Sequence, residues 1–248
     1  MAELSLASPF DSADIRAILL DIEGTTTPID FVFKTLFPFA ASHVEDFLRR
    51  HFHETEIATL IAQLREANEH DVTHGAVNWT DGASEQTIAS AATYVRWLIA
   101  GDSKITPLKT LQGKIWEQGF RSGELQGEVY PDVAPAFERW KKQGRRIAIF
   151  SSGSVLAQKL LFAHSTGGDL SPFLEAYFDT SIGPKREAAS YRKIARALQL
   201  PAEHIQFVSD VEAELDAGRA AGMKTALSLR PGIAAPQKAN HTAIRSFD

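Results

Sequence analysis

The chain has 248 residues, a formal net charge of −5 at pH 7 and no cysteine. This length suits one large domain, or a core with a smaller companion, and needs no disulfide to hold a hydrophobic core. The absence of cysteine excludes thiol nucleophiles and thiolate zinc sites, and the negative charge argues against nucleic acid or an anionic membrane as the main partner. Because no apolar stretch approaches the ~20 residues that span a bilayer, and residues 1–15 lack the pattern of a signal peptide, we expect a soluble, cytoplasmic protein.

The first predicted element is a short buried strand, Ala17–Leu20, made of four apolar residues. It leads into Asp21 and Glu23, which a turn rich in glycine and threonine follows. Side chains two residues apart in an extended segment point the same way, so both carboxylates can serve one site at the strand's carboxyl end. Such a carboxylate can coordinate Mg²⁺ or attack phosphorus, and its neighbour can move a proton. An ordinary strand-to-loop turn has the same residue types, so the pattern alone does not decide.

Residues from about 35 to 120 are predicted to be helical, because apolar residues recur there at i, i+3, i+4 and i+7. We expect Ser84 to cap one of these helices and Pro107 to lie in the first turn of another. The stretch 71–82, with two glycines and few aliphatic residues, is predicted to be a loop.

From residue 130 onward, predicted strands at 146–150, 205–208 and 224–229 alternate with predicted helices. Strands that alternate with helices indicate an α/β fold with a doubly wound parallel sheet. The helical segment then becomes a cap inserted after the first strand. We therefore predict a core of residues 1–30 and 126–248 and a cap of residues 31–125, with a peripheral tail after Pro231.

Polar side chains follow three of the predicted strands, and a loop adds a lysine. These residues are Asp21, Glu23, Ser151, Ser152, Lys185 and Asp210. Serine hydroxyls and backbone N–H groups at a helix start can hold phosphate oxygens, and a lysine supplies a point charge for a phosphoryl group. A second strand-end aspartate would share Mg²⁺ with the first. Each residue alone also fits a cap or a solvated loop, and Glu212 and Glu214 are expected to favour a helix dipole rather than bind metal.

The segment Asp21-Ile22-Glu23-Gly24-Thr25 resembles the Asp-x-Asp-Gly-Thr motif of the haloacid dehalogenase superfamily, with glutamate as the second acidic residue. With the threonines that follow, it resembles the enolase-phosphatase (acireductone synthase) family of methionine salvage. The similarity covers essentially the whole chain and includes Ser151–Val155, His164–Thr166, Phe178–Thr180 and Ser190–Ile194.

This resemblance implies a role for each candidate residue. Asp21 would be the nucleophile and a metal ligand, and Glu23 the second acidic site residue, acting through its side chain or its main-chain carbonyl. Ser151, Ser152 and Lys185 would bind substrate, and Asp210 would complete the Mg²⁺ site. The implied reaction enolises 2,3-diketo-5-methylthiopentyl-1-phosphate and then removes the phosphate to give the acireductone.

Three other functions remain open from the sequence. A generic Mg²⁺-dependent phosphatase for another small phosphate ester would share the same residues but would not enolise. A metal-free haloacid dehalogenase also uses a strand-end aspartate, although it leaves Glu23 and Asp210 without a role. The last alternative is a silent protein that only binds phosphorylated metabolites. We expect a monomer whose partner is a small phosphorylated molecule.

Overall fold

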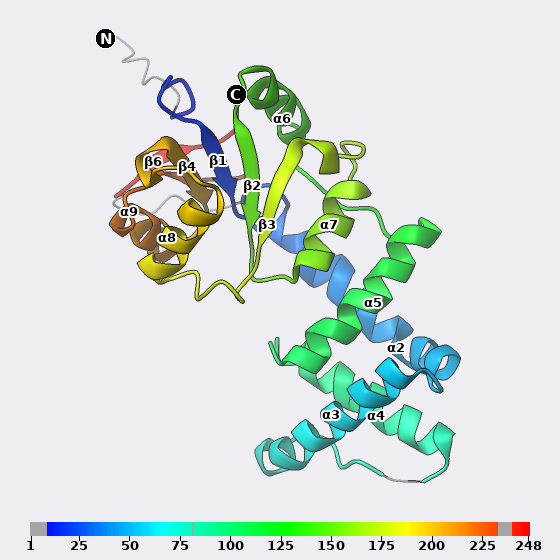
Figure 1. Cartoon of the computed structure of the whole chain (residues 1–248). Coiled ribbons are helices and arrows are strands. Elements are labelled where there is room, and N and C mark those ends of the chain that lie inside the picture. The colour runs from blue at the N-terminus through cyan, green and yellow to red at the C-terminus, as the bar shows by residue number, and fades with distance from the viewer. Residues whose placement is uncertain (1–8, 81, 233–239) are drawn as a thin grey trace. The chain divides into compact units, whose positions relative to one another are not determined.

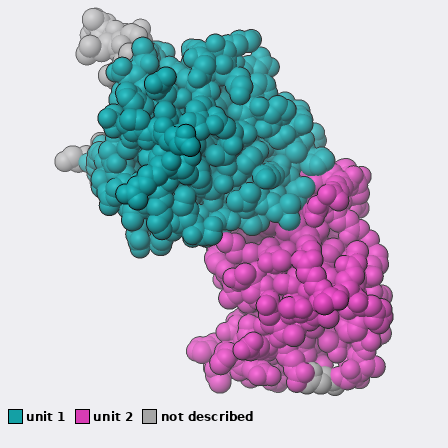
Figure 2. All heavy atoms as spheres, in the orientation of Figure 1, with its two compact units in different colours: residues 1–29, 126–248 teal, residues 30–125 magenta. Residues whose placement is uncertain are grey.

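The computed structural model describes residues 9–80, 82–232 and 240–248. The chain forms two compact units (Figure 2): residues 1–29 with 126–248 form unit 1, and residues 30–125 form unit 2. No helix of the described residues is both long and apolar enough to cross a membrane.

Unit 1 is built on a six-stranded sheet in which every strand pair is parallel (Figure 1), with the order β3-β2-β1-β4-β5-β6. The strands are β1 (Ala17–Leu20), β2 (Arg146–Phe150), β3 (Leu174–Phe178), β4 (Ile205–Ser209), β5 (Lys224–Ser228) and β6 (Thr242–Ile244). The predicted α/β fold with a parallel, doubly wound sheet is therefore confirmed. Because β1 pairs with both β2 and β4, the segments that follow these three strands meet at one edge of the sheet.

Helices cover both faces of this sheet, as its apolar strands require. They are α6 (Val133–Lys142), α7 (Val155–Ala163), α8 (Ala188–Ala197) and α9 (Glu212–Ala220), with short 3₁₀ turns η3 (Ser171–Phe173) and η4 (Ala202–His204). On one face, Leu19 and Phe207 share a buried cluster with Tyr191 of α8 and Leu215 of α9. On the other side, Phe137 and Trp140 of α6 pack against each other, and Phe137 also contacts Phe162 of α7.

Unit 2 is helical, as predicted for this part of the chain. Its elements are α1 (Ile29–Phe31), the π-helix η1 (Val32–Leu36), α2 (Phe37–His51), α3 (Thr55–Asp71), the 3₁₀ turn η2 (Val72–His74), α4 (Ser84–Ala100) and α5 (Thr106–Ser122). The buried Trp116 indole N–H donates to the carbonyl of Leu36 at 2.8 Å and so ties α5 to the end of η1. Pro107 lies in the first turn of α5, as predicted.

Three details differ from the predictions. Ala83, not Ser84, is the N-cap residue of α4, and its N–H donates to Gln86 Oε1 at 3.2 Å. The sequence does not predict the edge strand β3, because Leu174 is its only buried residue and its other positions show no strong apolar pattern. Beyond Gly232, the predicted peripheral tail is described only over residues 240–248, and this part is not peripheral, since it adds β6 to the sheet and buries Phe247 completely.

Candidate active site

The segment after β1 forms a tight turn of residues 21–27, which we call the β1 turn. Strand β1 ends where Asp21 donates its N–H to the Val208 carbonyl at 3.0 Å, so the turn starts beside the end of β4. The Ile22 carbonyl then accepts N–H bonds from Thr25, Thr26 and Thr27 at 2.9–3.1 Å. All three threonines are fully buried. The turn is thus a fixed part of the core rather than an exposed loop.

Asp21 is 4% exposed, and its carboxylate receives three hydrogen bonds. Oδ1 accepts the Ile22 N–H at 2.7 Å and lies 2.7 Å from Lys185 Nζ, while Oδ2 accepts from Ser209 Oγ at 3.1 Å. A carboxylate offers roughly four acceptor positions, so about one stays available for a ligand or a reaction. The sequence-predicted pair Asp21 and Lys185 therefore meets directly.

Lys185 also lies 2.7 Å from Oε2 of Glu214, a residue that sequence reasoning did not place in the site. Glu214 is on the first turn of α9 and its Oε2 accepts from Ser209 Oγ at 3.1 Å. Burial lowers the pKa of Lys185, but the charges of Asp21 and Glu214 outweigh this and hold that pKa above its usual value. Burial and the charge of Asp21 raise the pKa of Glu214 to about 7, even though Lys185 opposes the shift.

The position of Lys185 is set by residues of α8. Tyr191 donates its hydroxyl to the Lys185 carbonyl at 2.7 Å, and Ser190 donates to the Pro184 carbonyl at 2.7 Å. The ammonium group lies 5.7 Å from the centre of the Phe150 ring at the end of β2. The Ser190–Ile194 segment of the sequence resemblance thus supports the loop that carries the lysine.

Asp210 follows β4 and packs against the β1 turn. A Cβ placed on Gly24, whose φ is +66°, would lie 2.2 Å from Asp210 Oδ2, so the glycine is what permits this approach. Burial raises the pKa of Asp210 to about 7, and the charges of Asp21 and Glu23 add to this shift. Asp210 therefore belongs to the same electrostatic group as the other two acidic residues. Glu23 itself is half-buried in the β1 turn.

Ser151 and Ser152 begin the loop between β2 and α7, in register with the β1 turn. Ser151 is 3% exposed and its Oγ accepts the Gly153 N–H at 3.2 Å, while Ser152 is half-buried. Ser154 caps α7 by accepting the Ala157 N–H at 3.3 Å. Gln158 holds this loop, since its Nε2 donates to the carbonyls of Gly153 and Phe178, both at 2.9 Å. The loop presents hydroxyls and a helix start at the same edge as Asp21.

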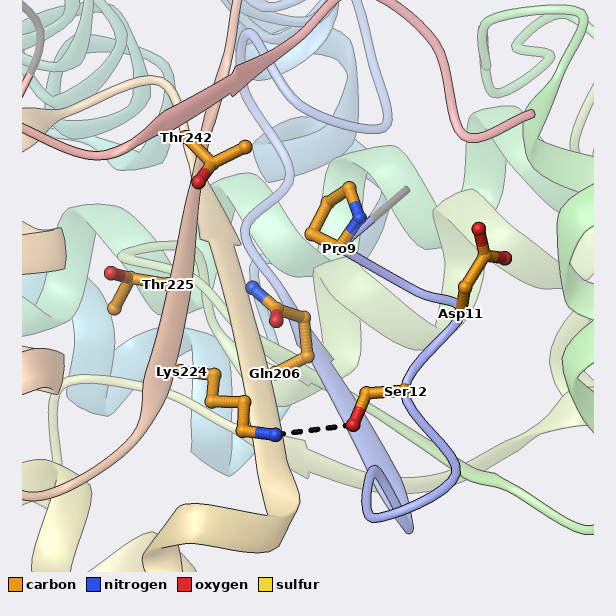
Figure 3. A pocket seen from close by; sticks show the side chains of 7 residues that line it. All are labelled: Pro9, Asp11, Ser12, Gln206, Lys224, Thr225 and Thr242. Carbon is orange, nitrogen blue, oxygen red and sulfur yellow. Dashed lines mark hydrogen bonds between the residues drawn. The ribbon is translucent and has the colours of Figure 1, made fainter. Parts of the chain in front are cut away.

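A cavity of about 440 Å³ lies elsewhere in unit 1 (Figure 3), near the amino ends of β4, β5 and β6. It is lined by Pro9, Asp11, Ser12, Gln206, Lys224, Thr225 and Thr242. Lys224 Nζ donates to Ser12 Oγ across it at 3.2 Å. None of the sequence-predicted site residues lines this cavity.

Comparison with known proteins gives the family. A model of haloacid dehalogenase-like hydrolases matches residues 15–222. The chain is 53% identical to the enolase-phosphatase E1 of Synechococcus elongatus, covering 94% of this chain and 97% of that protein. It is 48% identical to the Drosophila willistoni enolase-phosphatase E1, covering 89% of both chains.

A solved structure supports this relationship. The UTR4 protein of Saccharomyces cerevisiae is 33% identical, with a TM-score of 0.76, and covers 94% of this chain and 99% of its own. The Rhodobacter sphaeroides CbbY structure in complex with phosphate, 19% identical with a TM-score of 0.55, shares the fold alone. As the sequence motifs predict, the chain belongs to the enolase-phosphatase E1 family of haloacid dehalogenase-like hydrolases.

Proposed function

We infer that this protein is an enolase-phosphatase of methionine salvage. Its reaction converts 2,3-diketo-5-methylthiopentyl-1-phosphate to the acireductone 1,2-dihydroxy-3-keto-5-methylthiopentene and phosphate, which its membership of the enolase-phosphatase E1 family supports. The observation that carries the phosphatase step is the buried Asp21 carboxylate, held by Lys185 and Ser209 at the carboxyl end of β1.

We assign Asp21 as the nucleophile. Attack of a carboxylate oxygen on phosphorus forms an aspartyl phosphate and breaks the bond between phosphorus and the C1 oxygen, which leaves with the enol. Water then hydrolyses the aspartyl phosphate and restores the carboxylate. The three hydrogen bonds that orient Asp21 support this role, because a fixed nucleophile needs little further ordering before attack.

The remaining candidate residues would bind the phosphoryl group. Lys185 carries the charge that a phosphate needs, and its buried position makes that charge effective. The hydroxyls of Ser151 and Ser152, with the backbone N–H groups at the start of α7, would hold phosphate oxygens. Glu214, as the second carboxylate beside the Lys185 ammonium group, would help to hold that group in place.

Mg²⁺ fits the donor set at this edge. Asp21 and Asp210 follow the adjacent strands β1 and β4, and a cation would relieve the repulsion between these carboxylates. Within residues 9–80, 82–232 and 240–248, no cluster of three or more His, Cys, Asp or Glu side chains could hold a metal. This agrees with Mg²⁺, which usually takes one or two carboxylates and completes its shell with water and substrate oxygens.

We therefore propose that the side chains of Asp21 and Asp210 hold Mg²⁺ together with the main-chain carbonyl of Glu23, so that only two carboxylates bind the ion. When bound, the ion supplies positive charge that offsets the phosphate and polarises substrate oxygens. Enolisation needs a base for the C1 proton, and we propose the half-buried Glu23 carboxylate for this step.

The proposal also covers the domains, location and partners of the enzyme. We propose that residues 1–30 and 126–248 act as the catalytic core and residues 31–125 as its cap. We further propose that the enzyme is a cytoplasmic monomer that acts on a small phosphorylated molecule, without nucleic acid or membrane partners.

The decisive experiment supplies the diketo phosphate with Mg²⁺ and follows ultraviolet absorbance and inorganic phosphate together. We expect a transient conjugated enol followed by phosphate release. Phosphate release without an enol or acireductone signal would reduce the function to a plain phosphatase, and full activity in EDTA would contradict the metal assignment. Glu23→Gln should slow enol formation, and normal enolisation in that variant would remove Glu23 from the role of base.

A further inference from the structure

The β1 turn depends on side chains from another strand for its shape. Its own backbone bonds converge on the Ile22 carbonyl and on a bond from Gly24 N–H to the Thr27 carbonyl at 2.9 Å. The carbonyls of Gly24 and Thr25 instead accept side-chain donors. Ser228 Oγ donates to the Gly24 carbonyl at 3.0 Å, and Arg230 Nε donates to the Thr25 carbonyl at 2.8 Å.

Both donors come from the end of β5 and are deeply buried. Ser228 is the last residue of β5 and is 1% exposed, and Arg230 is 3% exposed. Neither residue belongs to the group of side chains around Asp21. Because each donor reaches a different carbonyl of the same turn, together they fix its orientation as well as its position.

Arg230 is itself held on several sides. Its Nη1 lies 2.7 Å from Asp132 Oδ2, and its guanidinium carbon lies 4.5 Å from the centre of the Tyr130 ring and 4.3 Å from that of Phe247. The same Asp132 oxygen accepts the Phe247 N–H at 2.6 Å. A charged group this buried needs such partners, and they restrict the orientation of the guanidinium, although no described group bonds to its buried Nη2.

The β1 turn carries Glu23, a proposed ligand of Mg²⁺, so the position of the turn matters for the metal site. The backbone of Gly24 lies against the Asp210 carboxylate so closely that even a methyl group there would overlap it. A displacement of the Gly24 carbonyl therefore changes the space open to Asp210. It also moves the backbone next to Glu23, which Gly24 directly follows. Active sites are sensitive to such shifts, since a misplacement of about 1 Å can cost on the order of 10²-fold in rate.

We propose that Ser228 and Arg230 are positioning residues for the metal-binding turn, with Asp132 and Phe247 orienting Arg230. The proposal gives them no contact with the substrate or the metal. They act by holding the Gly24 and Thr25 carbonyls, and so set the distance between the β1 turn and Asp210. This inference rests on the proposed function, because it assigns these residues to the Mg²⁺ site of that reaction.

The test uses Mn²⁺ as a probe for the Mg²⁺ site, with bound Mn²⁺ measured by electron paramagnetic resonance on the full-length protein. The variants are Ser228→Ala and Arg230→Lys; a lysine keeps the charge but has one nitrogen where Arg230 uses Nε and Nη1 for two partners. The matched control is Ser165→Ala, because Ser165 is 4% exposed and donates to the Gly168 carbonyl at 2.6 Å.

We expect both variants to weaken Mn²⁺ binding by about tenfold or more and to lower kcat with little change in KM, while Ser165→Ala keeps wild-type Mn²⁺ affinity. Circular dichroism checks that each variant is folded. Unchanged Mn²⁺ affinity in folded Ser228→Ala and Arg230→Lys would overturn the positioning role and leave the proposed function intact. Failure of the wild-type protein to bind Mn²⁺ would overturn both.

Discussion

The ammonium group of Lys185 lies 2.7 Å from Asp21 Oδ1, and only 10% and 6% of the two side chains are exposed. Glu214 lies equally close to the same ammonium group. One buried cation is therefore shared by two carboxylates. Burial, followed by the charge of Asp21, raises the pKa of Glu214 to about 7 although the residue forms an ion pair with Lys185.

Lys185→Met removes the cation that Asp21 and Glu214 share. We expect phosphatase activity to fall by about 10²–10³-fold, because a donor to the phosphoryl oxygens is lost. Two buried carboxylates would also lose their partner, at a cost of about 3–5 kcal/mol in the free energy of unfolding at pH 8. Urea unfolding at pH 5 and pH 8 tests this, since protonation of Glu214 should make the cost smaller at pH 5.

The double variant Lys185→Met/Glu214→Gln is the control for Lys185→Met. It removes one buried carboxylate together with the lysine, so most of the lost stability should return. Activity should stay low. Recovery of activity in the double variant would show that Lys185 has only a structural role.

Gly24→Ala should prevent Asp210 from taking its place. The new methyl group would lie 2.2 Å from Asp210 Oδ2, on a backbone whose φ of +66° already disfavours any side chain. We expect Mg²⁺-dependent activity to fall below about one tenth of wild type, because a displaced Asp210 misplaces the metal. Steady-state kinetics against Mg²⁺ concentration measure it.

Gly144→Ala is the matched control for Gly24→Ala, because Gly144 has a φ of +74° but nothing within 4 Å of its added Cβ. It should lose about 1 kcal/mol of stability from the same backbone strain and keep its activity. Equal loss of activity in both variants would mean that strain, not contact with Asp210, decides the outcome at Gly24.

Asp210→Asn should make the metal-free protein more stable at pH 8. The folded pKa of Asp210, about 7, lies above the ~3.9 of an unfolded aspartate. The contribution of Asp210 to the free energy of unfolding is therefore complete below about pH 4 and is lost as the pH rises through 7. The neutral asparagine avoids this loss, which amounts to at most about 4 kcal/mol. Urea unfolding in EDTA at pH 5 and pH 8 tests the prediction, and an equal difference at both pH values would contradict it.

Gln158→Met should loosen the loop that presents Ser151 and Ser152. The amide of Gln158 joins the Gly153 and Phe178 carbonyls, and methionine keeps the volume while leaving both without this donor. We expect KM for a chromogenic phosphate ester, and the inhibition constant of inorganic phosphate, to rise several-fold. A change in kcat alone would place the effect outside the phosphate-binding loop.

Two of the candidate site residues can be predicted from the sequence, because runs of apolar residues mark where buried strands end. Asp21 and Asp210 each follow a short run of apolar residues, and parallel pairing then brings such ends to one edge. The structure also brings Lys185 to Asp21. This lysine lies in a loop, so no strand end marks it; the positive charge that a phosphoryl group needs makes it a candidate, and the family resemblance agrees with that choice.

Ser209 and Glu214 could not be found in the same way. Ser209 is the last residue of β4 and looks like an ordinary strand end, but its hydroxyl donates to both Asp21 and Glu214. Glu214 follows Asp210 at i+4, the spacing that returns a side chain to the same side of a helix start. The Asp-x-x-x-Glu spacing was the available signal, and its other explanation, a favourable helix dipole, was the simpler one.

The tail shows a different limit of sequence reasoning. Strand β6 has three residues, none of them fully buried, and so carries almost no periodic signal. Phe247 is a single aromatic residue whose burial depends on Trp140 and Arg230, which lie far from it in the sequence. Tertiary contacts rather than local pattern therefore decide where these residues lie.

The chain leaves unit 1 after β1 and returns to it before α6, and in between it builds a helical unit with its own buried residues. Lys185 and Ser209, the two side chains that hold the Asp21 carboxylate, both belong to unit 1. The residues that we propose to cleave the phosphate ester therefore all lie outside the stretch 30–125. Sequence drift within that stretch can leave these catalytic side chains as they were inherited.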